Sequence, residues 1–69
     1  MTPQEYRAAL AALGLSQLAA GRWLGVSPKT AQNYATVGPS GPAARAVVML
    51  LDMSPAARAK ALARVMPDA

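Results

Sequence analysis

Residues 13–36 read LGLSQLAAGRWLGVSPKTAQNYAT, and this stretch decides how the chain folds. Ser16 and Ser27 each stand before a run of helix-forming residues, and serine is a preferred N-cap of helices. Gly25 separates the two runs, and glycine readily adopts the left-handed conformation that ends a helix and turns the chain. The stretch therefore predicts two short helices, over residues 17–24 and 28–36, joined by a tight turn.

The rest of the chain carries start and stop signals of the same kind. Thr2 and Glu5 have the spacing of a capping box, and Gly14 is a natural helix stop. Pro42 ends a loop rich in proline and glycine, and Ser54 precedes another proline at the first position of a helix. These signals predict further helices over residues 3–13, from 42 to about 51 and from 55 to about 65.

No part of the chain alternates between apolar and polar residues for long enough to indicate a β-strand. A length of 69 residues indicates one domain rather than two. The sequence therefore predicts an all-α fold, a compact bundle of about five short helices that occupies residues 1–69 as a single domain.

The composition argues against catalysis and against metal binding. The chain has no cysteine and no histidine, and its acidic residues are Glu5, Asp52 and Asp68. General acid–base chemistry and metal sites therefore have almost no suitable side chains. We expect no enzyme activity, no metal, no cofactor and no small-molecule ligand.

Two observations argue against a membrane location. The apolar run at residues 46–51 is far too short to span a bilayer, and the N-terminus lacks the basic region of a signal peptide. The last helix, PAARAKALARVM, has too thin an apolar face for a membrane-surface segment. A cytoplasmic location is expected.

Charge is distributed unevenly along the chain. The net charge is +4, and no acidic residue lies between Glu5 and Asp52. A small basic domain with an acid-free middle favours a polyanionic partner such as a nucleic acid. The alternative is that a modest positive charge only keeps an alanine-rich domain soluble.

The helix expected at residues 28–36 is rich in side chains that can bond a base edge or a phosphate. Lys29, Thr30, Gln32 and Asn33 face outward or along its flanks if Ala31 and Tyr34 form the buried side. Such a pair of helices, over about residues 16–36, is the sequence form of a helix-turn-helix, whose second helix enters the DNA major groove. An ordinary solvated helix face is the alternative interpretation.

The spacing resembles that of the Cro and lambda-repressor-like (XRE-type) helix-turn-helix family. The resemblance covers about residues 13–51 and includes LGVSPKT at 24–30, and GPAARAVVMLLD looks like the same segment of small phage and prophage regulators. The chain departs from the family at Gly21, where alanine is usual, and at Ala31, where valine or isoleucine is usual. We expect the glycine to weaken its helix by roughly 1 kcal/mol and the alanine to reduce the core contact. The positions that carry the pattern are Gln17, Gly21, Gly25, Ala31 and Tyr34.

The resemblance implies two sets of DNA-contacting positions. Lysine can donate to guanine, and glutamine and asparagine can each pair with adenine. The implied base-reading residues are Ser27, Pro28, Lys29, Gln32 and Asn33. The implied phosphate contacts are Gln17, Thr30, Thr36, Ser40 and Arg45.

The helices expected over residues 42–66 carry more apolar surface than a small core needs, which indicates an interface. Helix-turn-helix proteins commonly dimerise so that two recognition helices reach half-sites about 34 Å apart. The expected dimer contacts are Val48, Leu51, Leu62, Val65 and Met66. The prediction is thus a homodimeric, sequence-specific regulator of transcription, most often a repressor on a palindromic double-stranded DNA operator, in a bacterial or phage-infected cell.

Two other function classes remain open. One is a protein-interaction module, an adaptor or antitoxin-like partner that uses the same fold. The other is a non-specific nucleic-acid binder, whose sign is a steep salt dependence without sequence preference. Trp23 with Arg22 also suggests a base-stacking site, but we expect Trp23 to cover the core edge beside the first or fourth helix and Arg22 to be surface charge away from the DNA.

Overall fold

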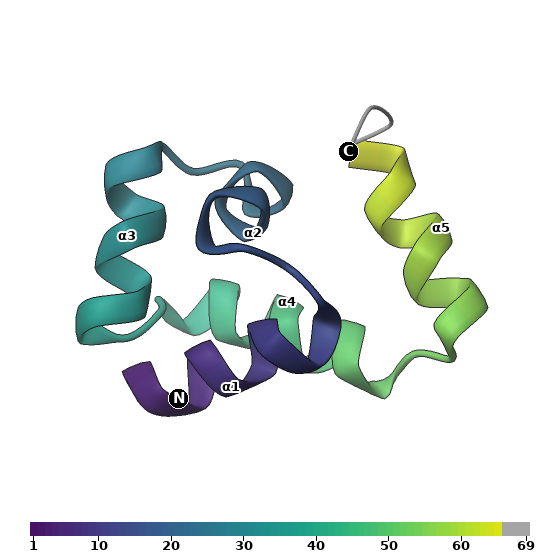
Figure 1. Ribbon diagram of the computed structural model, residues 1–69, viewed down its shortest axis with the longest axis horizontal. Coiled ribbons are helices and arrows are strands. Elements are labelled where there is room, and N and C mark those ends of the chain that lie inside the picture. The colour runs from purple at the N-terminus through teal and green to yellow at the C-terminus, as the bar shows by residue number, and fades with distance from the viewer. Residues whose placement is uncertain (66–69) are drawn as a thin grey trace.

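The computed structural model describes residues 1–65, which form five helices and no strand. The predicted all-α fold is therefore confirmed (Figure 1). The third helix runs one residue further than expected and the fourth begins one residue earlier, so the loop between them shrinks to residues 38–40. The helices are α1 (Pro3–Leu13), α2 (Gln17–Leu24), α3 (Pro28–Val37), α4 (Gly41–Asp52) and α5 (Pro55–Val65). Within the described residues, every helix is too short or too polar to cross a bilayer.

Helix starts are set by side-chain caps. Thr2 Oγ1 accepts from the Glu5 backbone N–H at 3.1 Å, and Glu5 Oε1 accepts from the Thr2 N–H at 2.7 Å, which completes the predicted capping box. The hydrogen bond from the Thr2 backbone holds the pKa of Glu5 below its ordinary value. Each of the other four helices begins with a serine hydroxyl that accepts from the N–H three residues on. Gly14 and Gly25 end α1 and α2 at φ values of 71° and 77°.

The core lies where α1 meets α2, α3 and α4. Tyr6, at 0% exposure, is the largest fully buried side chain, and its ring meets that of Tyr34 edge-on, with centroids 6.1 Å apart. Tyr34 is partly buried and packs against the core, as predicted. The core cluster consists of Tyr6, Ala9, Leu10, Ala20, Ala35 and Val47.

Helices α2 and α3 approach each other closely at Gly21 and Ala31. A Cβ atom placed at Gly21 would lie 2.4 Å from the Cβ of Ala31, which is itself 1% exposed. The two backbones can therefore meet only because residue 21 has no side chain. The two departures from the family pattern therefore lie against each other, and a side chain at residue 21 would meet the Cβ of Ala31.

Two arginine side chains connect helices through backbone carbonyls. Arg7 of α1 donates to the carbonyl of Ala35 near the end of α3. Arg58 of α5 donates from Nε to the Leu50 carbonyl at 3.1 Å and from Nη2 to that of Leu51 at 3.3 Å, so it satisfies acceptors at the end of α4.

The indole of Trp23 takes a place that the sequence did not predict. Its Nε1–H donates to the carbonyl of Ala61 at 3.2 Å, which attaches α2 to α5. Trp23 was expected beside the first or fourth helix, and its hydrogen bond joins it to the fifth. Figure 1 shows α5 at the end of the molecule opposite α3, so this contact belongs to the side remote from α3.

The contact at Gly21 generates a stability prediction. Gly21→Ala should lower the free energy of unfolding by about 1–3 kcal/mol, because overpacking against the Cβ of Ala31 outweighs the gain in helix propensity. Gly41→Ala is the matched control, since a Cβ there meets nothing within 4 Å. Urea denaturation followed by circular dichroism measures both changes. A Gly21→Ala protein more stable than the wild type would contradict the proposed contact.

A second prediction concerns the hydroxyl of Tyr6, which is buried and has no hydrogen-bond partner among the described residues. Burial raises the pKa of Tyr6 above its ordinary value of 10.0. Tyr6→Phe should therefore leave the free energy of unfolding at neutral pH unchanged or raise it by up to about 1 kcal/mol. Above pH 10 the wild type should lose more stability than the variant, because its unfolded chain releases that proton first.

Tyr34→Phe is the control for the Tyr6 experiment, since the Tyr34 hydroxyl lies 3.3 Å from Ser40 Oγ and its removal breaks that hydrogen bond. Denaturation curves at pH 7 and in the alkaline range compare the three proteins. A large loss of stability at neutral pH in Tyr6→Phe would show that the hydroxyl has a partner.

Candidate nucleic-acid interface

The outer side of α3 is an exposed polar surface. Ala31 and Ala35 are buried against the other helices, and Tyr34 is partly buried beside them. The opposite side is open to solvent, and Figure 1 shows α3 at one end of the described molecule. The predicted base-reading residues Pro28, Lys29, Gln32 and Asn33 are all exposed on α3, and Ser27 is exposed at its N-cap.

Three side chains of this surface have no internal role in the fold. Within the described part of the chain, Lys29, Gln32 and Asn33 make no side-chain hydrogen bond to another residue. Their donors and acceptors are therefore available to a ligand. An ammonium in this region can bind a negatively charged group, and two amides can form hydrogen bonds with a group that has both donors and acceptors.

The hydroxyl groups on α3 and at its two ends already make hydrogen bonds within the fold. Ser27 Oγ accepts from the Thr30 N–H at 3.2 Å and donates to Thr30 Oγ1 at 3.1 Å. Thr36 Oγ1 donates to the Gln32 carbonyl at 3.1 Å. Ser40 caps α4 by accepting from the Ala43 N–H at 3.3 Å. These hydroxyls hold helix ends and turns, and they can offer only their remaining hydrogen-bonding capacity to a ligand.

The predicted phosphate contacts do not all share one surface. Gln17, the first residue of α2, is exposed and lies beside α3, where it lines a shallow groove with Pro28 and Gln32. It also borders a hollow formed with Arg7 and Ser16. Gln17 is therefore the candidate that the fold brings directly to α3.

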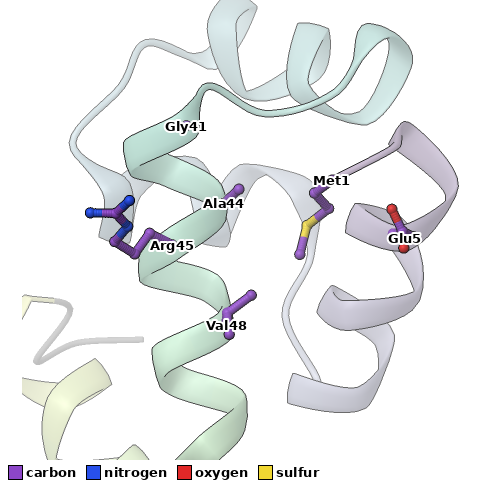
Figure 2. A pocket seen from close by; sticks show the side chains of 6 residues that line it. All are labelled: Met1, Glu5, Gly41, Ala44, Arg45 and Val48. Atoms are coloured by element: carbon purple, nitrogen blue, oxygen red, sulfur yellow. The ribbon is translucent and has the colours of Figure 1, made fainter.

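The other phosphate candidates are more dispersed. Thr30 is half-buried, and Thr36 lies in the last turn of α3. Arg45 lies on α4, in a separate groove lined by Met1, Glu5 and Val48 (Figure 2). The structure thus places Gln17, at the start of α2, beside Pro28 and Gln32 of α3, and leaves Arg45 on a different surface.

Leu18 lines the candidate interface, although the sequence did not predict it there. It is 48% exposed on α2 and lines the groove formed by Gln17, Pro28, Ala31 and Gln32. An apolar residue in a short helix is easily assigned to the core. The available signal was the helical spacing of Ala20, Gly21 and Leu24, which leaves position 18 off the inward face.

The electrostatics of the α2–α3 region are positive. Neither helix contains a carboxylate, whereas Arg22 and Lys29 are both exposed on them. Glu5 lies on α1 and Asp52 at the end of α4, and Asp68 lies outside the described residues. In residues 1–65 no three metal-ligating side chains are grouped closely enough to hold a metal ion.

The predicted dimer contacts have mixed exposure. Val48 is 45% exposed, whereas Leu51 is partly buried against the core and Leu62 is partly buried on α5. The side chain of Val65 and the whole of Met66 lie outside the described part of the chain. Met49, 57% exposed, and Met1, 42% exposed, are apolar surface residues that the prediction did not include.

Comparison with known proteins supplies no relative for this chain. No protein-family model, no curated protein and no solved structure matches it significantly. The functional interpretation therefore rests on the chemistry of the exposed side of α3 and of the groove between α2 and α3.

Proposed function

We propose that this protein is a sequence-specific double-stranded DNA-binding regulator of transcription. It acts as a repressor and binds a palindromic operator as a homodimer. In this proposal α2 and α3 form a helix-turn-helix of the XRE type, and α3 enters the major groove. The observation that carries it is the exposed, uncommitted set of Lys29, Gln32 and Asn33 on a helix pair without carboxylates.

The dimensions of α3 suit this role. An α-helix with its side chains is about 10–12 Å in diameter, and the major groove is about 12 Å wide, so α3 with its 10 residues can enter it. The helix lies at one end of the described molecule, so its outer side can approach a duplex without a clash from α5. Gly25, with φ of 77°, permits the tight corner that sets α3 beyond α2.

Each exposed side chain has a role that follows from its chemistry. Lys29 can donate to guanine O6 and N7 or to a phosphate. Gln32 and Asn33 can each donate to and accept from adenine, which presents both kinds of group in the major groove. Gln17 and the free N–H groups at the start of α2 can bind a phosphate and so fix the register of α3.

The helix pair is rigid before any ligand arrives. Ser16 and Ser27 cap the two helices, and the contact between Gly21 and Ala31 fixes the distance between their axes. Little conformational entropy is then lost when the surface binds, which favours affinity. This rigidity supports base reading, since hydrogen bonds to base edges demand accurate placement.

The first test of the proposal is selection from a library of random duplexes at near-physiological salt, followed by sequencing. An enriched inverted repeat with half-sites about one helical turn apart is expected. Weak and uniform retention of all duplexes would support the non-specific binder. No retention by a protein that is folded by circular dichroism would support the protein-interaction module.

Variants of the amide side chains then test base reading. Gln32→Ala and Asn33→Ala should each weaken binding to the selected site by about 1–3 kcal/mol and have little effect on random DNA. Gln4→Ala is the matched control, because Gln4 is exposed on α1 and distant in sequence from α3. Fluorescence anisotropy with both duplexes gives the affinities. Equal losses on the two duplexes would rule out base reading by these residues.

Lysine variants separate base contact from phosphate contact. Lys29→Ala should reduce the slope of log affinity against log salt by about 1 if the ammonium neutralises a phosphate. If it reads guanine instead, the loss should be confined to the selected sequence. Lys60→Ala, an exposed lysine on α5, is the control for the loss of one positive charge.

Leu18 generates a separate prediction about thymine. The groove between α2 and α3 has apolar walls from Leu18 and Pro28 and an amide from Gln32 at its edge. The thymine methyl is the apolar group that the major groove presents. Replacing one operator thymine by uracil should therefore weaken wild-type binding by roughly tenfold or less, and this difference should vanish in Leu18→Ala.

The uracil scan isolates the methyl group because the base pairing of the operator does not change. Val37→Ala serves as the control, since Val37 is 74% exposed at the far end of α3. A wild-type protein that binds uracil and thymine operators equally at every position would exclude the methyl contact and leave base reading by Gln32 and Asn33 intact.

A further inference from the structure

We propose that a second copy of this chain docks on the surface formed by the outer side of α4 and the start of α1, across a two-fold axis. This inference deepens the proposed function by naming the surface through which the homodimer forms, and its biological meaning rests on that function. The surface, called here the α1–α4 face, consists of Met1, Glu5, Ala44, Arg45, Val48 and Met49.

Exposed apolar side chains gather on the α1–α4 face. Met1, Val48 and Met49 are 42%, 45% and 57% exposed, and they account for three of the five large exposed apolar side chains among the described residues. The core does not need them, because Val47 and Leu50 already provide the buried side of α4. Surplus apolar surface of this kind on a small domain indicates a contact with another protein surface.

The face is also shaped to receive another helix. Met1, Glu5, Ala44 and Val48 line a groove between α1 and α4, and a second groove runs along Pro42, Ala46 and Met49. Figure 2 shows Ala44 and Val48 projecting from α4 toward Met1. A Cβ placed at Gly41, where α4 begins, would meet nothing within 4 Å, so the backbone there is open to close approach.

The charges at the two rims are opposite. Figure 2 shows Glu5 on α1 beyond Met1, whereas Arg45 projects from the other side of α4. Glu5 Oε1 accepts from the Thr2 N–H, which leaves Oε2 for another donor. Across the groove between α1 and α4 the order is therefore acidic rim, apolar strip, basic rim, and Arg45 also lines the second groove, which contains Met49.

This order makes the face self-complementary. A two-fold axis that runs along the apolar strip turns a second copy so that its basic rim meets the acidic rim of the first. Each Glu5 then faces the Arg45 of the other copy, and the strips of Val48 and Met1 pack together. A partner of one charge sign would repel one of the two rims, so a second copy fits better than a generic acidic or basic protein.

The α1–α4 face leaves the DNA-binding surface free. A Cβ placed at Gly38, directly after α3, would lie 3.2 Å from the Met1 carbonyl, so the face adjoins the C-terminal end of α3, whereas Lys29 lies near its N-terminal end. The exposed residues Lys29 and Gln32 remain uncovered in the dimer. Since the face belongs to a single short helix and one chain end, we expect a weak dimer with a dissociation constant of about micromolar order.

The test is sedimentation equilibrium of the full chain without DNA, over a wide range of concentration. The wild type should be a dimer at high concentration and dissociate on dilution. Arg45→Glu should weaken the dimer roughly tenfold or more, because each Glu5 then faces a like charge. Arg64→Glu is the matched control, since Arg64 is exposed on α5 and away from the face.

Complementary charge reversals test the pairing itself. Glu5→Lys and Arg45→Glu should each weaken self-association, whereas an equimolar mixture of the two should form a heterodimer with both rims matched. The double variant Glu5→Lys/Arg45→Glu should again form a homodimer. Circular dichroism confirms that each protein is folded, which matters because Glu5→Lys removes part of the α1 cap.

The outcomes separate the two proposals. A wild type that stays monomeric at all concentrations, or an Arg45→Glu and a Val48→Glu protein that dimerise like the wild type, would overturn the interface. A wild type that stays monomeric at every concentration and still binds a single half-site specifically would reject the interface but keep the DNA-binding proposal. A wild type that dimerises through this face but selects no duplex would keep the interface and reject the DNA-binding proposal.

Discussion

The contact between Gly21 and Ala31 is the constraint on which the rest of the structure depends. It brings α2 and α3 together at backbone distance, and it allows α3 to present its outer side beyond the corner at Gly25. Three of the six residues of the core cluster are alanine, so the helices pack closely around the larger side chains of Tyr6, Leu10 and Val47. Small residues at this crossing therefore determine where the polar surface of α3 stands.

The helices were predictable from the sequence because their signals are local. A hydroxyl at each start and a glycine after α1 and α2 act within three or four residues, and the predicted boundaries agree with the structure to within a residue or so. The exposed positions of Lys29, Gln32 and Asn33 also followed from periodicity, since Ala31 and Tyr34 define the opposite side. That they contact DNA stays a proposal.

Other features depended on contacts between segments far apart in the chain, and periodicity does not contain that information. In the sequence, Gly21 and Ala31 are two separate departures from the helix-turn-helix family pattern, and nothing there indicates that they contact each other. The hydrogen bonds of Trp23 to α5 and of Arg58 to the end of α4 join residues whose sequence neighbours give no hint of them. The exposure of Leu18 and the separation of Arg45 from α3 likewise emerged from the packing of helices in space.

The hydrogen bond between Trp23 and Ala61 has a practical consequence. Trp23 is the single tryptophan of the chain, and its indole is half-buried at the junction of α2 and α5. Its emission spectrum therefore serves as a built-in optical sensor for the docking of α5, separate from the circular dichroism signal that reports total helix content. If α5 detaches before the other four helices melt, a red shift of the fluorescence will precede the loss of ellipticity and reveal a sub-global opening.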